Sequence, residues 1–214
     1  MKLYPILFEA AKTAEEAMQR GLGLHIYEKS SERIAILFDI EKMKEAASFC
    51  NQDDEDLYGK LQKLFESTGV VVAQITFAPT SFSIKNLYSI RKSSALEKFG
   101  PLSYEIVMSF IYPSYLRSDK TVSDKAKNVW DRMFNRTDVE HQPLKDWYPT
   151  KKESGSSLDY AYRKNIDFST FEPLIEHGTN AIQEVADSLY LDASDVQHTL
   201  SMSAHEHFWS LYGK

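Results

Sequence analysis

The polar and apolar positions of residues 13–39 change from a helical to a strand pattern. Thr13-Ala-Glu-Glu16 has the spacing of a capping box, in which Thr13 caps the helix and Glu16 reaches back. Gly21 or Gly23 offers a stop for this helix. The following segment, GLHIYEKSSERIAILFDI, has two runs rich in β-branched and aromatic residues around a polar turn. The pattern therefore predicts a short helix followed by a β-hairpin.

The next part of the chain repeats both patterns. DDEDLYGKLQKLFES has its leucines on one side of a helix that stops near Gly69. GVVVAQITFAP and IKNLYSIRKSS are predicted strands, which the loop APTSFS joins in a hairpin relation.

Residues 96–111, LEKFGPLSYEIVMSFI, raise the main functional question. A glycine and a proline lead directly into an apolar helix, predicted over residues 101–112 and broken by Pro113. SYLRSDK is then a short strand or loop, and Ser123 caps another helix. Its apolar positions have helical spacing: Ala126, Val129, Trp130, Met133 and Phe134.

Beyond these helices the composition shifts to Pro, Gly, Ser and charged residues. We interpret residues 137–157 as a linker, and Ser169, Thr179 and Asp192 as N-caps of three short helices. The sequence thus predicts an α/β fold (an α+β mixed sheet with helices on its faces) in residues 1–136, the linker, and a helical region in residues 158–214.

Composition and charge limit the possible functions. The chain has 214 residues and no apolar run of transmembrane length, so we expect no membrane span. Its N-terminus has no secretion signal and Cys50 is its one cysteine, which fits the cytoplasm. Residues 158–214 contain nine acidic and three basic residues, whereas the first 157 residues are balanced. This acidic region argues against direct nucleic-acid binding and allows docking to a basic partner.

The start of the helix at residue 101 could hold a phosphate. The first N–H groups of a helix have no intrahelical partners and carry a partial positive charge. Gly100 has no side chain to block approach, and Lys98 could add charge. The candidate donors are the amides of Phe99, Gly100, Leu102 and Ser103. An ordinary helix start without a ligand is the alternative.

Other chemical motifs are weaker. His205 and His207 are two positions apart on a helix and do not converge on one face, so we expect no metal site. Cys50 has no basic neighbour that would favour its thiolate. Neither a Walker loop nor a dinucleotide-binding fingerprint occurs.

The ordered blocks GPLSYEIVMSFI, DKTVSDKAKNVWDRMFNRTDV and LDYAYR resemble GNAT-type acyltransferases, and more narrowly the GNAT-like proteins of bacteriophages. The resemblance covers roughly residues 70–163. It implies a GNAT-like fold with a C-terminal helical appendage, acetyl-CoA as co-substrate, and acyl transfer to an amine.

The resemblance also implies residue roles. The pantetheine would pair with the strand at residues 87–91, and the pyrophosphate would rest on residues 97–103. The implied acyl-CoA-binding residues are Leu87, Tyr88, Ser89, Ile90, Arg91, Lys98, Phe99, Gly100, Pro101, Leu102, Ser103 and Asn128. Asp119 or Glu105 is the candidate base, acting directly or through water.

Two departures from the family pattern leave a second hypothesis open. Lys98 stands where the loop would have its first glycine, and the helix KNVWDRMFN has no tyrosine to protonate the leaving thiolate. The chain is therefore either an N-acetyltransferase with an unidentified amine acceptor, or a non-catalytic GNAT-like protein that binds a host or phage protein through its acidic C-terminal helices.

Overall fold

A computed structural model describes residues 13–81, 84–96, 99–119, 121–145 and 156–212, with only the backbone described for 205–212. The strands are β1 Leu22–Lys29, β2 Glu32–Asp39, β3 Val71–Thr80, β4 Leu87–Ala95, β5 Tyr115–Arg117, β6 Glu140–Pro143 and β7 Tyr160–Arg163. The helices are α1 Ala14–Gln19, α2 Ile40–Ser48, α3 Leu57–Thr68, α4 Gly100–Phe110, α5 Asp124–Phe134, α6 Glu172–Leu189 and α7 Ala193–Tyr212. Two 3₁₀ turns, η1 Ser157–Asp159 and η2 Phe168–Phe171, complete the described elements.

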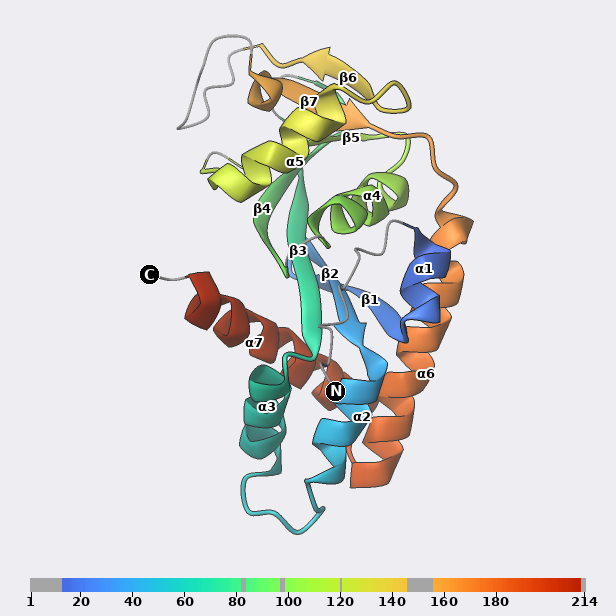
Figure 1. Ribbon diagram of the computed structural model, residues 1–214, viewed down its shortest axis with the longest axis vertical. Helices are drawn as coiled ribbons and strands as arrows, with labels where there is room; N and C mark the ends of the chain where they lie inside the picture. Colours follow the sequence, from blue (N-terminus) through green and yellow to red (C-terminus); the bar gives the residue numbers. More distant parts are fainter. Residues whose placement is uncertain (1–12, 82–83, 97–98, 120, 146–155, 213–214) are drawn as a thin grey trace, which may run out of the picture.

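The strands form one seven-stranded mixed sheet in the order β1-β2-β3-β4-β5-β7-β6 (Figure 1). Neighbouring strands from β1 to β4 are antiparallel, and so are β5, β7 and β6, whereas β4 and β5 are parallel. Helix α4 connects the parallel pair, because parallel strands need a crossover connection. The predicted mixed α/β class is confirmed.

Side chains alternate between two apolar cores, one on each face of the sheet. On β2, Ala35 and Leu37 lie in the core that also contains residues of α1, α4 and α5. Ile36 and Phe38 point to the other face. We call the second core the helical core; its members on α2, α3, α6 and α7 include Met43, Leu61, Phe65, Ile182, Val185, Val196 and Leu200.

Helix α6 runs beside the edge strand β1 (Figure 1) and passes from one core to the other. Each of the two elements has a glycine where they meet, Gly178 on α6 and Gly23 on β1. A Cβ at Gly178 would lie 2.6 Å from the carbonyl oxygen of Leu24, and a Cβ at Gly23 would lie 2.7 Å from the Cα of Gly178. Close packing of α6 against β1 therefore depends on the missing side chains, and it covers an otherwise open sheet edge.

Several predicted helix ends are confirmed by side-chain and backbone geometry. Thr13 accepts a hydrogen bond from the amide of Glu16 at 3.1 Å, and Ser123 accepts one from Ala126 at 3.2 Å. Gly69 ends α3 with φ +63°. Helix α2 was not predicted; Asp39, the last residue of β2, caps it by accepting from the amide of Lys42.

The C-terminal part differs from the prediction. One long helix, α6, starts at Glu172 and passes through Thr179, so Thr179 is not an N-cap. Strand β6 lies within the expected linker, and β7 lies within the expected C-terminal helical region. Because both strands belong to the common sheet, the boundaries expected at 136/137 and 157/158 fall inside it.

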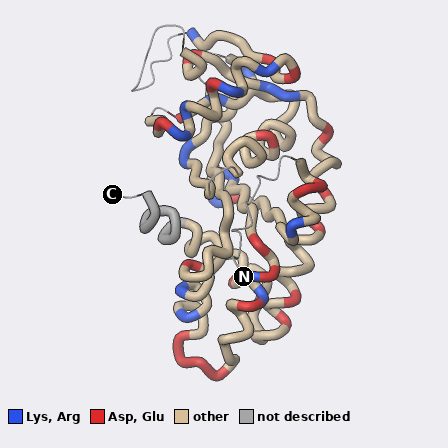
Figure 2. Tube along the Cα trace, in the orientation of Figure 1, with Lys and Arg blue, Asp and Glu red and all other residues tan. Residues whose placement is uncertain are grey.

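Charges are unevenly distributed over the molecule (Figure 2). Lys and Arg gather around the end that contains α5 and β5–β7, whereas acidic residues line α6 and the connection between α2 and α3. No helix in the described part of the chain is long and apolar enough to cross a membrane.

Candidate functional site

The parallel strands β4 and β5 pair over only three residues and then separate. Leu87 to Ser89 on β4 align with Tyr115 to Arg117 on β5. We call the point after Ser89 and Arg117 the fork. Beyond it, β4 continues to Ala95 paired with β3 on one side, and no described strand pairs with its other side.

The fork changes the expected role of β4. Leu87, Tyr88 and Ser89 are aligned with β5, so their backbone on that side already has a neighbouring strand. Of the five β4 residues implied to bind pantetheine, only Ile90 and Arg91 lie on the open stretch. The part of β4 without a described partner strand on that side is therefore farther along the chain than expected.

Helix α4 begins at Gly100, five positions after the last residue of β4, and part of its donor set is occupied. The Phe99 amide donates to the Leu96 carbonyl, and the Ser103 amide donates to the Phe99 carbonyl, both at 3.2 Å. Pro101 has no N–H to donate. Among the four expected donors, Gly100 and Leu102 therefore remain, since neither makes a hydrogen bond to another described residue. Lys98 lies outside the described residues.

Phe99, the N-cap residue of α4, makes no side-chain capping bond. A Cβ placed on Gly100 would come within 3.4 Å of Val129 Cγ2, so α5 lies beside this helix start. Asn128 is on the exposed side of α5, where it borders an open hollow of about 640 Å³. Its other lining residues are Asp131, Arg132, Asn135 and Arg136.

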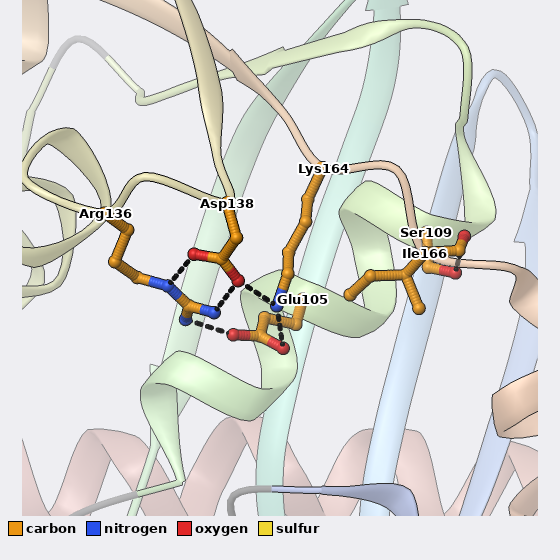
Figure 3. Close-up of polar contacts among 6 residues, drawn as sticks. All are labelled: Glu105, Ser109, Arg136, Asp138, Lys164 and Ile166. Atoms are coloured by element: carbon orange, nitrogen blue, oxygen red, sulfur yellow. Dashed lines mark hydrogen bonds and ion pairs between the residues drawn. The ribbon is translucent and has the colours of Figure 1, made fainter.

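Glu105 lies in a cluster of charges rather than in an open site (Figure 3). Its carboxylate pairs with Arg136 and, at 3.0 Å, with Lys164 Nζ. Asp138 joins both cations, at 2.6 Å to Arg136 Nη2 and 3.1 Å to Lys164 Nζ. We call these four residues the ion cluster. Both oxygens of Glu105 face cations, which argues against its expected role as a base.

The ion cluster shifts the pKa values of Asp138 and Arg136. Hydrogen bonds from Arg136 lower the pKa of the Asp138 carboxyl well below its usual range, and Lys164 adds to this effect. The same contacts with Asp138 and Glu105 raise the pKa of Arg136. Asp138 and Arg136 therefore stay charged at neutral pH. The ion pairs of the cluster connect α4 with the segments that follow α5 and β7.

Arg117, which the sequence analysis did not select, lies at the fork with 5% of its surface exposed. Burial lowers the pKa of its guanidinium to about 10, and the positive charge of Arg91 acts in the same direction. Asp119, the other candidate base, opposes this shift and is partly exposed. The sequence shows an arginine within the short segment YLRS. A segment of this length has too few positions for an apolar pattern that would predict whether the arginine is buried.

Two tyrosine side chains near the fork, those of Tyr104 and Tyr162, are buried and hydrogen-bonded. The Tyr104 hydroxyl lies 3.0 Å from Ser93 Oγ on the open stretch of β4, and the Tyr162 hydroxyl donates to the Ser157 carbonyl at 2.5 Å. Trp130 of α5 packs between their rings, with both centroid distances 5.0 Å. Trp130 thus occupies the interior face of α5.

No group of three or more His, Cys, Asp and Glu side chains within the described residues could hold a metal ion. Comparisons with family models, with curated proteins and with solved structures found no match to this chain.

Proposed function

We propose that the chain is a GNAT-like N-acyltransferase that binds acetyl-CoA at the fork and transfers the acetyl group to an amine. The observation that supports this most is the open edge of β4, which leads from the fork to the start of α4. The bacteriophage branch of the family and a cytoplasmic location remain predictions from the sequence.

The open edge offers backbone groups to the amides of pantetheine. Residues from Ile90 to Ser94 have no described strand on that side, so their outward N–H and C=O groups can pair with an extended ligand. At the end of this stretch, the amides of Gly100 and Leu102 and the helix dipole favour a phosphate. The basic residues around this end of the molecule also suit an anionic cofactor (Figure 2).

The transfer needs little covalent participation by the protein. The amine nitrogen attacks the thioester carbonyl carbon, a C–N bond forms and the C–S bond breaks. The amine proton passes to a carboxylate or water, and the leaving thiolate takes a proton. Holding both reactants together supplies much of the acceleration. Asp119, which follows β5 by two residues and is partly exposed, is the proposed proton acceptor.

Thermal unfolding with and without acetyl-CoA tests the binding site. A ligand at a hundred times its Kd stabilises the fold by about 2.7 kcal/mol. Gly100→Glu places a carboxylate where the phosphate would sit, so we expect it to abolish the shift. Ser67→Glu adds the same charge at an exposed position on α3 and should leave the shift intact. No shift in the wild-type protein, or an equal shift in Gly100→Glu, would refute the site.

A non-catalytic GNAT-like binding protein is the second candidate, and two observations favour it. Glu105 is held by two cations, and the exposed acidic residues of α6 form a charged surface for a basic protein partner (Figure 2). An assay of the free thiol released from acetyl-CoA distinguishes the acyltransferase from the non-catalytic binding protein. The assay is run in the presence of a panel of amines. Binding without any thiol release above the buffer rate would favour the second candidate.

A further inference from the structure

Arg117 is a buried cation at the fork. It is aligned with Ser89 across the parallel pair and is the last residue of β5. Side chains alternate along a strand. Leu116 packs in the core that contains α4, so Arg117 points to the opposite face of the sheet, as Tyr115 does.

Charged side chains lie close together at this point. Arg91, two residues beyond Ser89, is close enough for its charge to disfavour the Arg117 guanidinium, and Asp119 offsets this in part. Among the described residues, Arg117, Arg91 and Asp119 thus influence one another where the strands separate. A planar guanidinium with five N–H donors matches a carboxylate in bidentate geometry.

Ser118 adds a second, independent observation. It follows Arg117 directly, is 2% exposed, and its hydroxyl has no hydrogen-bond partner among the described residues. Buried hydroxyl groups in proteins normally have a partner. A polar ligand group at the fork would provide one.

We propose that Arg117, assisted by Arg91 and Ser118, binds a carboxylate at the far end of the acyl chain. This rests on the proposed function and names its donor class: CoA thioesters of short dicarboxylic acids. The length of β4 from Ala95 back to Ser89 is about 20 Å, comparable to an extended pantetheine arm. A donor whose phosphates lie at the start of α4 therefore brings its acyl group to Arg117.

The test is calorimetric titration of the full chain with acetyl-CoA and with succinyl-CoA. We expect the wild-type protein to bind succinyl-CoA at least tenfold more tightly. Arg117→Gln should remove this preference without weakening acetyl-CoA binding. Arg91→Gln, at an exposed position, should reduce the preference in part. Lys63→Gln removes an exposed cation from α3 and should change neither affinity.

The outcomes separate the two proposals. Equal affinities for both thioesters, or a preference that persists in Arg117→Gln, would overturn the carboxylate site and leave the acyl-CoA site standing. Failure of either thioester to bind would overturn the proposed function itself. If Arg117→Gln does not fold, Arg91→Gln decides: an unreduced preference in that variant contradicts the proposal.

Discussion

The helical core and the ion cluster solve the same structural problem with different interactions. Each joins segments that are far apart in the sequence. The helical core joins α2, α3, α6 and α7 to one face of the sheet through buried apolar side chains. The ion cluster joins α4 to the segments after α5 and β7 through Glu105, Arg136, Asp138 and Lys164.

This difference determines how each region responds to its surroundings. Apolar burial contributes in proportion to the area removed from water and is not weakened by electrostatic screening. Partly exposed ion pairs are screened by salt and depend on protonation. The fork lies at the end of the molecule that contains the ion cluster, so conditions that weaken the cluster should affect the proposed site before they affect the helical core.

The largest expected effect comes from the helical core. Phe65 on α3 is 1% exposed, and Phe65→Ala should lower the free energy of unfolding by about 3–5 kcal/mol, because it leaves a cavity. Urea denaturation at two sodium chloride concentrations measures this, and the loss should not shrink at the higher concentration. Ser67→Ala, on the exposed side of the same helix, should change stability by less than about 0.5 kcal/mol. If added salt reduced the loss of unfolding free energy in Phe65→Ala, the proposed difference between the helical core and the ion cluster would be wrong.

The glycine crossing of α6 and β1 gives the next largest effect. Gly→Ala inside a helix normally stabilises by up to about 1 kcal/mol. At Gly178, however, the new Cβ would lie 2.6 Å from the Leu24 carbonyl oxygen. We expect Gly178→Ala to destabilise by about 2 kcal/mol, because α6 must move away from the edge strand. Denaturant unfolding measures the sign, and a stabilised variant would show that α6 is not pressed against β1.

The sequence predicted those parts of the fold that local chemistry determines. Helices begin after Thr13 and Ser123 and one ends at Gly69, as expected, since capping depends on residues only three or four positions apart. Thr179 failed as an N-cap because the apolar stripe of α6 continues through it into the helical core. Tertiary burial outweighed a local preference there.

The sequence did not predict that β6 and β7 pair with the common sheet. Strands β6 and β7 have four residues each, and neither has enough alternation to distinguish a strand from a linker. At the candidate site, the glycine and proline at the start of α4 could be found by pattern. The burial of Arg117 and the pairing of Glu105 could not, because each depends on segments brought together by the sheet.

A substitution in the ion cluster tests the electrostatic half of the comparison with the helical core. Lys164→Met leaves the two carboxylates with only Arg136 as their cation within the cluster. Hydrogen bonds to charged groups contribute about 1.5–3 kcal/mol, and partial exposure places the expected loss near the lower value. The loss should shrink in high salt, unlike that of Phe65→Ala. Lys127→Met, which removes an i,i+4 pair with Asp131 on α5, should cost about 0.5 kcal/mol or less.

The smallest expected effect concerns pH. Because Arg136 lowers the pKa of Asp138 in the folded protein, its stabilisation is complete above the unfolded pKa of about 3.9 and is lost as pH falls through the lower folded pKa. The Asp138 side chain is 52% exposed, so screening limits the effect to below about 1 kcal/mol.

Asp138→Asn should therefore flatten the dependence of unfolding free energy on pH between about pH 4 and pH 2. Urea unfolding at several pH values measures the slope. In the Lys164→Met background the carboxyl has lost one of its two cations, so the same substitution should flatten the slope less. An equal change in both backgrounds would mean that Lys164 does not act on Asp138, and the ion cluster would reduce to its Arg136 contacts.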